Sequence, residues 1–359
     1  MLSHLKKFDW PLVTAAVLLV IFGLISIYGS GGVELLNFKK QILWLILGFF
    51  LMIAVSLFDY RVFKNYRVPV ISIYVFSLFL LLGVLIFGVE VRGATSWYHI
   101  GPITLEPVEF VKIILILLLA KYFSMRHIEM YRVRHVIISG IYVFLPASLV
   151  FIQPDSGSVM ILLSIWMGVM LIAGIKLKHI IALALIGIVV LSAAWIFAFQ
   201  DYQKDRILSF MNPQLDPRGA SYNSLQSVIA IGSGGIWGKG IGEGTQTQLG
   251  FLPEAHTDFI YAAIVEEMGL IGGFMLLASF IFFIRRVMYI SKNSENNFAR
   301  LVAAGFSIML ISQVTINTGM NIGILPITGI PLPFVSYGGS SLISLFLMMG
   351  VLQSIRVNR

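Results

Sequence analysis

The chain contains no cysteine, so it can form neither a disulfide framework nor a cysteine-ligated metal site. Charged residues are also scarce: they make up 12% of the 359 residues, against 58% hydrophobic residues, and the mean hydropathy is +0.91. Soluble domains of this length are not so apolar, and the composition indicates a polytopic membrane protein. The formal net charge of +8 does not indicate a nucleic-acid-binding surface, because the lysines and arginines lie in short loops between apolar segments.

Motifs for nucleotide and metal binding are missing as well. The glycine cluster at residues 232–244, GSGGIWGKGIGEG, resembles a phosphate-binding loop, but Lys239 is followed by glycine instead of serine or threonine, and the motif spacing fails. The chain also has no HExxH zinc motif. The sequence therefore predicts no nucleotide cofactor and argues against ATP-driven transport by this chain alone.

Ten apolar segments are long enough to cross a bilayer, for which about 20 mainly apolar residues are needed. They lie approximately at residues 10–28, 41–58, 68–89, 107–122, 136–152, 157–175, 179–199, 257–284, 298–317 and 334–355. The first segment lacks a small-residue cleavage site, so we expect a retained helix and not a signal peptide. The sequence predicts an all-α polytopic fold with ten transmembrane helices, in one membrane domain of residues 1–359.

The distribution of basic residues predicts the orientation of these helices. One side of the membrane collects 17 lysine and arginine residues and the other side 7, with Lys112 inside a helix completing the 25. The positive-inside rule then places both termini in the cytoplasm. The same orientation puts residues 200–256, between the seventh and eighth helices, outside. Because loops of this length are either functional or disordered, and this one carries apolar residues for a short amphipathic helix, we expect an ordered external cap.

Two charged residues lie in the outer half of the expected fourth helix. Glu109 and Lys112 are three residues apart and share a helix face, so they can form an ion pair. A charge in a spanning segment costs about 3 kcal/mol on insertion scales, so such charges normally face the bundle interior. The pair either fixes helix packing or forms the floor of a polar cavity open to the outside. The preceding loop, RGATSWYHIGPITLEP, offers Arg92 as a cation at the outer rim, suited to a phosphate.

Two aspartates begin apolar segments, Asp155 in QPDSGS and Asp258 in FLPEAHTDFI. Each could be a helix N-cap, as could Thr257 beside Asp258. Asp258 also lies at the water boundary, where a carboxylate stays ionised and can accept a proton from a substrate hydroxyl. His256 could belong to the same rim. A divalent cation bound by Asp258 with Glu254 or Asp155 is a further alternative, although the spacing does not require it.

Two adjacent glutamates follow, at positions 266 and 267. They lie about 12 to 13.5 Å along the helix from Asp258, at 1.5 Å rise per residue. Adjacent residues differ by about 100° around a helix, so the two carboxylates cannot face one point. We expect mainly structural roles, with Gln313 or Asn317 of the ninth helix as the partner of one of them.

Residues 317–341, NTGMNIGILPITGIPLPFVSYGGSS, resemble the signature of the shape, elongation, division and sporulation family of bacterial membrane proteins. RGATSW, EPVEFVK, QPDSGS and FLPEAHTDFI follow in the family's order, so the resemblance covers nearly the whole chain. DPRGASYNSLQS and GTQTQLGFLPE are closer to the elongation branch than to the division branch. The resemblance implies a peptidoglycan glycosyltransferase of the bacterial cytoplasmic membrane, which polymerises lipid II at the outer face with a class B penicillin-binding protein as partner.

The resemblance also carries residue roles over to this chain. The family's essential external carboxylate falls on Asp258, and the polar cavity residues of its fourth helix fall on Glu109 and Lys112. The aspartate of its QPD motif falls on Asp155. The chain departs from the family where its fourth helix begins, because the motif commonly reads Gln-Pro-Ser-Glu and this chain has glutamate at position 106. A second departure is Ser96, where many members carry a basic residue.

The chemistry of glycan polymerisation fits these residues. We hypothesise that Asp258 deprotonates the acceptor's 4-hydroxyl, which attacks C1 of the donor with inversion to give a β-1,4 linkage. Arg92, Lys112, Lys239 or a divalent cation, Mg²⁺ or Mn²⁺, would stabilise the pyrophosphate leaving group. The remaining expected substrate contacts are Glu109, Asp155, Glu254, His256 and Thr257. Two alternatives from other classes are a lipid II flippase and a non-catalytic scaffold for a penicillin-binding protein.

Overall fold

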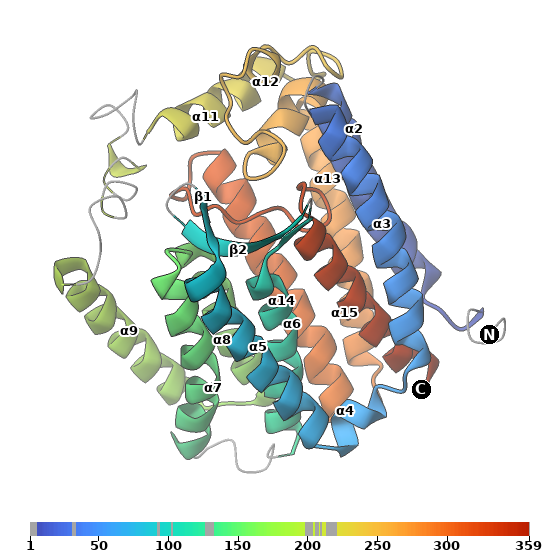
Figure 1. Ribbon diagram of the computed structural model, residues 1–359, viewed down its shortest axis with the longest axis vertical. Coiled ribbons are helices and arrows are strands. Elements are labelled where there is room, and N and C mark those ends of the chain that lie inside the picture. Colours follow the sequence, from blue (N-terminus) through green and yellow to red (C-terminus); the bar gives the residue numbers. More distant parts are fainter. Residues whose placement is uncertain are drawn as a thin grey trace.

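The computed structural model describes residues 6–30, 34–91, 94–101, 103–125, 133–197, 204, 208, 210–212 and 221–358. Most of these residues are helical (Figure 1). The long helices are α2 (Trp10–Gly29), α3 (Glu34–Leu57), α5 (Val68–Phe87), α6 (Pro107–Ser124), α7 (Val133–Ile152), α8 (Ser156–Ala173), α9 (Leu177–Phe197), α13 (Ile260–Lys292), α14 (Asn297–Asn321) and α15 (Gly339–Val357). The short helices are α4 (Arg61–Asn65), α11 (Tyr222–Gly234) and α12 (Thr245–Gln248).

Eight of the described helices are long and apolar enough to cross a membrane: α2, α3, α5, α7, α8, α13, α14 and α15. The other two long helices, α6 and α9, also lie where the hydropathy pattern predicts spans, but they are not among the eight. Helix α6 carries three charged residues, Glu109, Lys112 and Lys121. A helical membrane fold with several spans is therefore confirmed, and the count of ten spans stays a prediction.

The two ends of the chain meet at one end of the helix bundle. Arg286 of α13 binds the carboxylate of Asp9 through two nitrogens, at 2.6 Å from Nη2 and 3.1 Å from Nε. Near the other end of the chain, Gln353 of α15 accepts a hydrogen bond from the backbone N–H of Asp9, at 2.9 Å. Helices α11 and α12 cover the opposite end of the bundle (Figure 1). This arrangement agrees with both termini lying on one side of the membrane, away from the 200–256 segment.

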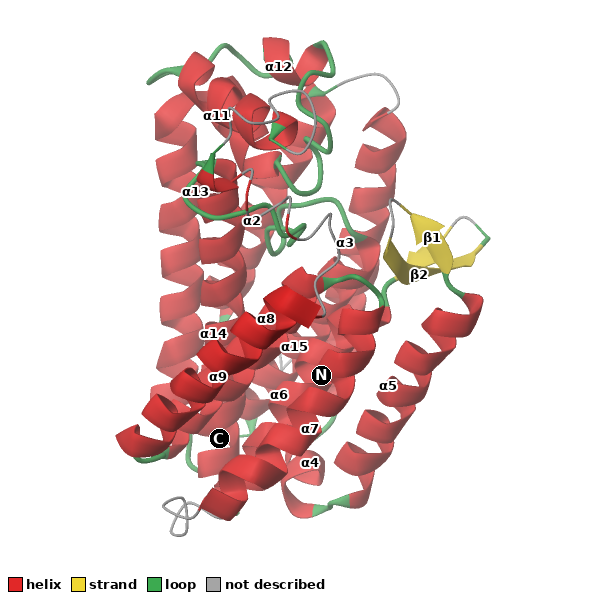
Figure 2. Ribbon diagram, turned by 90° about the vertical axis from the view of Figure 1, so that its left-hand side faces the viewer, coloured by secondary structure: helices red, strands yellow, loops and turns green. Residues whose placement is uncertain are grey.

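The segment before α6 forms a small sheet in place of the expected loop, so the prediction of an all-α fold is wrong here. Strands β1 (Val89–Val91), β2 (Ala94–Ile100) and β3 (Ile103–Leu105) pair antiparallel in that order, beside the end of α5 (Figure 2). Trp97 lies opposite Val89, and His99 lies opposite Thr104. The strands contain several valine, isoleucine, threonine and aromatic residues, which suit a pleated surface.

Helix α13 begins three residues later than predicted and is interrupted at Gly269, where φ is 71° and ψ is −176°. The break leaves some backbone N–H and C=O groups of α13 without a partner inside the helix. The glycine-rich segment before α12 supplies hydrogen-bond partners for these groups. The backbone N–H groups of Leu270 and Ile271 donate to the carbonyl oxygens of Gly235 and Ile236, at 2.9 and 3.3 Å. In the other direction, the N–H groups of Lys239 and Gly240 donate to the backbone carbonyl oxygens of Glu266 and Glu267, both at 3.0 Å. A Cβ on Gly238 would lie 2.2 Å from the carbonyl oxygen of Glu267. The glycine cluster thus allows close backbone packing against the broken helix.

Candidate active site

Asp258 lies in a turn that precedes α13, not in the helix itself. The N-cap of α13 is Phe259, so the N-cap interpretation of Thr257 and Asp258 is wrong. The backbone N–H groups of Thr257 and Phe259 both donate to the carbonyl of Glu254, each at 3.1 Å, which closes the turn before the first helical residue. The side-chain hydroxyl of Thr257 donates to Glu254 Oε2 at 3.0 Å. Four of the predicted site residues, 254 and 256–258, are thereby brought together in one turn.

Two buried asparagines of α14 hold the backbone of this turn. Asn317 Nδ2 and Asn321 Nδ2 each donate to the carbonyl oxygen of Asp258, at 3.0 Å. The side-chain oxygen of Asn321 accepts from the N–H of Ala262, at 3.0 Å, in the first turn of α13. An amide suits this place because it can donate and accept at once. Of the two candidate partners predicted for an α13 glutamate, Gln313 or Asn317, the choice of Asn317 is therefore wrong.

The asparagines were missed as positioning residues by sequence reasoning, although a signal was present. Asn317 and Asn321 are four residues apart in NTGMN and therefore lie on one face of α14. Two buried amides on one helix face in an apolar chain need partners, and a neighbouring turn can supply them.

The segment between α14 and α15 covers the Asp258 turn from the other side. Ser336 Oγ donates to the carbonyl oxygen of Thr257 at 2.6 Å, and the N–H of Tyr337 donates to the carbonyl oxygen of His256 at 2.8 Å. A Cβ on Gly329 would lie 3.7 Å from Asp258 Oδ2, so the catalytic candidate's carboxylate faces this segment. The position favours glycine, because φ is 73°.

The same segment also contacts the start of α8, where Asp155 lies. A Cβ on Gly157 would lie 2.6 Å from the carbonyl oxygen of Thr328 and 2.8 Å from the side chain of Ile330. Asp155 accepts a hydrogen bond from the N–H of Ser158 at 2.9 Å, so its N-cap interpretation is confirmed. Residues 328–330 therefore lie between the Asp258 carboxylate and the start of α8.

The charges of α6 form the predicted ion pair. Lys112 Nζ lies 2.7 Å from Glu109 Oε1, and the two side chains are 1% and 2% exposed. Next to this pair, the backbone N–H of Glu106 donates to Ser340 Oγ of α15 at 2.9 Å. The side chain of Trp97 in β2 forms a hydrogen bond with the Glu106 carboxyl. The N-terminal end of α6 is therefore a polar cluster joined to α15 and the sheet.

Glu106 differs chemically from the other carboxyls of this cluster. Burial, and then the negative charges of Glu109 and Asp155, raise its pKa to about 8, against the opposing effects of Lys112 and of the Trp97 hydrogen bond. The side chain is therefore mainly protonated at neutral pH. The sequence pointed to Glu106 only through its departure from the family motif, which commonly has glutamine at this position.

This protonation predicts a pH dependence of stability. The unfolded chain releases the Glu106 proton near pH 4.5, whereas the folded chain keeps it to about pH 8. The contribution of this carboxyl to stability therefore falls as the pH rises from about 4.5 to about 8, and is constant above that range. We expect Glu106→Gln to flatten this part of the thermal unfolding midpoint profile, measured in detergent from pH 5 to 9. The exposed Glu243→Gln is the control, and an equal slope in the Glu106 variant and the unmodified protein contradicts the prediction.

Lys239 and Arg92 were both predicted as cations for a pyrophosphate, and only Lys239 lies among the described residues. Lys239 Nζ lies 3.2 Å from Glu266 Oε1 of α13 and 2.7 Å from Thr245 Oγ1 of α12, so its charge is already paired inside the protein. Arg92 lies outside the described residues.

Among the residues that the structure describes, no three histidine, aspartate or glutamate side chains are arranged to hold a metal ion. A divalent cation shared with a substrate pyrophosphate needs only one or two protein carboxylates, so the Mg²⁺ or Mn²⁺ ion stays a prediction.

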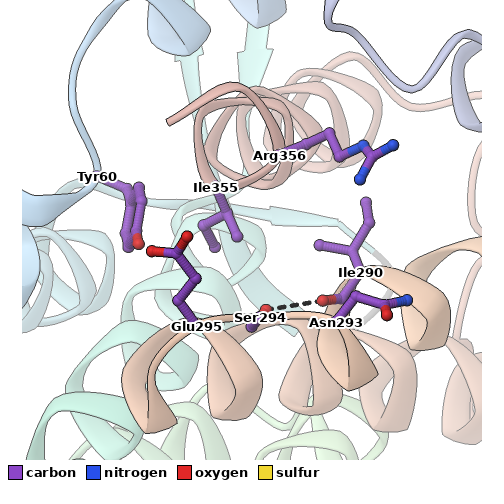
Figure 3. A pocket seen from close by; sticks show the side chains of 7 residues that line it. All are labelled: Tyr60, Ile290, Asn293, Ser294, Glu295, Ile355 and Arg356. Carbon is purple, nitrogen blue, oxygen red and sulfur yellow. Dashed lines mark hydrogen bonds between the residues drawn. The ribbon is translucent and has the colours of Figure 1, made fainter. Parts of the chain in front are cut away.

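A pocket also lies at the other end of the bundle, around the turn between α13 and α14. It is lined by Tyr60, Ile290, Asn293, Ser294, Glu295, Ile355 and Arg356 (Figure 3). Helix α13 has 33 residues and would span about 50 Å if straight. The pocket is therefore remote from Asp258, which precedes the first residue of the same helix.

Comparison with known proteins agrees with this arrangement. A family model described as cell cycle protein, FtsW, RodA and SpoVE, matches residues 8–359. The chain is 35% identical to the peptidoglycan glycosyltransferase MrdB of Escherichia coli K12, over 95% of this chain and 91% of that protein. It is similar to a chain of a peptidoglycan synthase complex described as coordinating polymerization and crosslinking, with a TM-score of 0.83, 29% identity and 98% of each chain covered. It is also similar to the rod shape determining protein RodA of Thermus thermophilus, with a TM-score of 0.72, 26% identity, and 98% and 97% covered.

The family match covers all the elements that build the site, from the strands before α6 to the segment between α14 and α15. The chain belongs to the FtsW, RodA and SpoVE family of bacterial cell cycle proteins.

Proposed function

We propose that this chain is a peptidoglycan glycosyltransferase that polymerises lipid II into β-1,4-linked glycan strands during cell elongation. The observation that carries the proposal is the Asp258 turn, whose backbone is held by two buried asparagines while its carboxylate faces Gly329. A general base needs such a fixed position, because proton transfer depends on hydrogen-bonding distance to the reacting hydroxyl. Relatives named as peptidoglycan glycosyltransferases match nearly the full chain.

The proposed reaction needs one base and no protein acid. Asp258 takes the proton from the acceptor's 4-hydroxyl, and the resulting oxygen attacks C1 of the donor sugar. The bond from C1 to the lipid pyrophosphate breaks as the new glycosidic bond forms, and the configuration at C1 inverts. The pyrophosphate leaves as an anion, so it does not need the second carboxyl that glycoside hydrolysis uses to protonate an alkoxide.

The polar cluster at the outer end of α6 is the proposed binding region for the donor. Lys112, paired with Glu109, is the proposed cation for the pyrophosphate. Asp155 is a further proposed contact, at the start of α8, which touches residues 328 and 330 through Gly157. Arg92 is a further proposed pyrophosphate contact. Glu254, His256 and Thr257 supply contacts to the acceptor sugar on the turn that carries the base.

The proposed membrane arrangement has ten spanning helices, with both termini in the cytoplasm and residues 200–256 and Asp258 outside. The described apolar side chains of α9 are strongly exposed, as at Leu185, Val189 and Phe197, which suits contact with lipid tails. The proposed partner is a class B penicillin-binding protein that crosslinks the strands. The similar chain from a peptidoglycan synthase complex supports this assignment.

Reconstitution with labelled lipid II tests the function against both alternatives. The purified full-length protein is incubated in vesicles, with and without a class B penicillin-binding partner whose transpeptidase is blocked, and the products are separated by gel electrophoresis. We expect a ladder of glycan chains that depends on this chain. A flippase would move lipid II across the bilayer without a ladder, and a scaffold would bind the partner while producing none.

A further inference from the structure

The carboxylate of Glu266 collects hydrogen bonds from a separate part of the chain. Its Oε1 accepts from the N–H of Gln246 at 2.8 Å, and its Oε2 accepts from the N–H and the hydroxyl of Thr247 at 3.1 and 2.8 Å. Lys239 adds the ion pair at 3.2 Å. Glu266 is fully buried, and a Cβ on Gly244 would lie 2.8 Å from its Oε2. The side chain therefore fixes the loop around α12 to the first half of α13.

This loop is joined to the turn that carries the catalytic candidate. The carbonyl of Gln246 accepts from the N–H of Leu252 at 3.0 Å. The side chain of Leu252 is buried in a small apolar cluster with Ala255 and Phe259, which flank Asp258 in the sequence. A displacement of the α12 loop therefore displaces the residues on both sides of Asp258.

From these contacts we propose that Glu266 is a positioning residue for the polymerisation reaction, acting through the α12 loop and Leu252 on the Asp258 carboxylate. The inference rests on the proposed function. Its physical basis is that Glu266 meets only donors, since two N–H groups, three hydroxyls and an ammonium point at its two oxygens. A carboxylate can accept all of these bonds, whereas a glutamine of the same shape turns an NH₂ group toward one set of donors.

The adjacent Glu267 is a matched control on the same helix. Its Oε1 accepts only one hydrogen bond among the described residues, from the N–H of Gly242 at 3.2 Å, and its Oε2 has no hydrogen-bond partner. It is nearly as buried as Glu266, but among the described residues it accepts no hydrogen bond from residues 244–252, the loop around α12. Glu267→Gln therefore replaces a buried carboxyl at this depth without removing the hydrogen bonds to residues 244–252.

The test compares Glu266→Gln and Glu267→Gln in the full-length protein with its partner. Amide hydrogen exchange is measured for residues 244–252 and 253–259, together with kcat and KM for lipid II polymerisation and the thermal unfolding midpoint. For Glu266→Gln we expect faster exchange in both segments and a fall in kcat of about 10- to 100-fold, because a displacement of about 1 Å can cost on the order of 100-fold. We expect a smaller change in KM, and exchange and kcat of Glu267→Gln within about twofold of the unmodified protein.

Several outcomes overturn the inference. Unchanged exchange in Glu266→Gln would show that its contacts do not hold the loop, and faster exchange with an unchanged kcat would show that the loop does not position Asp258. An equal fall in kcat for Glu267→Gln would assign the effect to the loss of any buried carboxyl at this depth and not to the bonds with residues 244–252. If Glu266→Gln does not fold, Thr247→Val is used in its place, because it removes one hydrogen-bond donor to Glu266. For this variant we expect the same faster amide exchange and lower kcat, each by a smaller factor. An unmodified protein that makes no polymer refutes the proposed function itself, whatever the exchange rates are, and the positioning role with it.

Discussion

Asp258→Asn lowers the rate of lipid II polymerisation by about 10²- to 10⁴-fold, the range typical of losing a general base. Asparagine has nearly the same shape as aspartate but accepts no proton at neutral pH. The asparagines of α14 bind the backbone carbonyl of residue 258, not its side chain, so the turn is expected to persist in the variant. The measurement is the initial rate of glycan formation by the purified protein with its partner, at saturating labelled lipid II.

The control for this variant is Glu243→Gln, an exposed carboxylate in the segment between α11 and α12. We expect it to polymerise at the unmodified rate. Asp258→Asn should also keep its thermal unfolding midpoint and its complex with the partner, which separates lost chemistry from lost structure. Polymerisation by Asp258→Asn at the native rate would exclude Asp258 as the base.

The second large effect is on stability, from the buried ion pair of α6. Lys112→Met leaves the Glu109 carboxylate buried without its partner, and breaking a buried pair in this way costs about 3–5 kcal/mol. For a chain of this size we expect a fall in the thermal unfolding midpoint of roughly 5–10 °C. The double variant Glu109→Gln with Lys112→Met should regain much of the loss, because no isolated charge remains. Unfolding in detergent, followed by circular dichroism, measures the three midpoints.

The double variant also decides between the two interpretations of the pair. If the pair only fixes helix packing, the double variant polymerises lipid II near the unmodified rate. If Lys112 binds the pyrophosphate, the double variant is stable but slow. The exposed Lys178→Met is the control for loss of a lysine, with an expected change within about 0.5 kcal/mol. A midpoint of Lys112→Met equal to that of this control would contradict a destabilising charge at Glu109.

The sequence alone determined the features that depend on neighbouring residues. Long apolar segments determined a membrane fold, because a spanning helix satisfies its own backbone within about 20 residues. Spacing of three residues determined the Glu109–Lys112 pair, since such residues share a helix face. The N-cap role of Asp155 also follows from a local bond, to Ser158. Asp258 was found by its place at a polar to apolar boundary, together with the family resemblance.

Only the tertiary structure decided which groups meet across the bundle. The bonds from Asn317 and Asn321 to Asp258 join residues 59 and 63 positions apart, and no periodicity in the chain encodes such a distance. The break at Gly269 is stabilised by backbone groups of residues 235–240, so a pattern of apolar residues could not show it. The partners of Glu266 come from the α12 loop for the same reason. Local sequence specifies helices through their own hydrogen bonds, whereas a buried polar side chain takes whatever partner the packing of distant segments brings within reach.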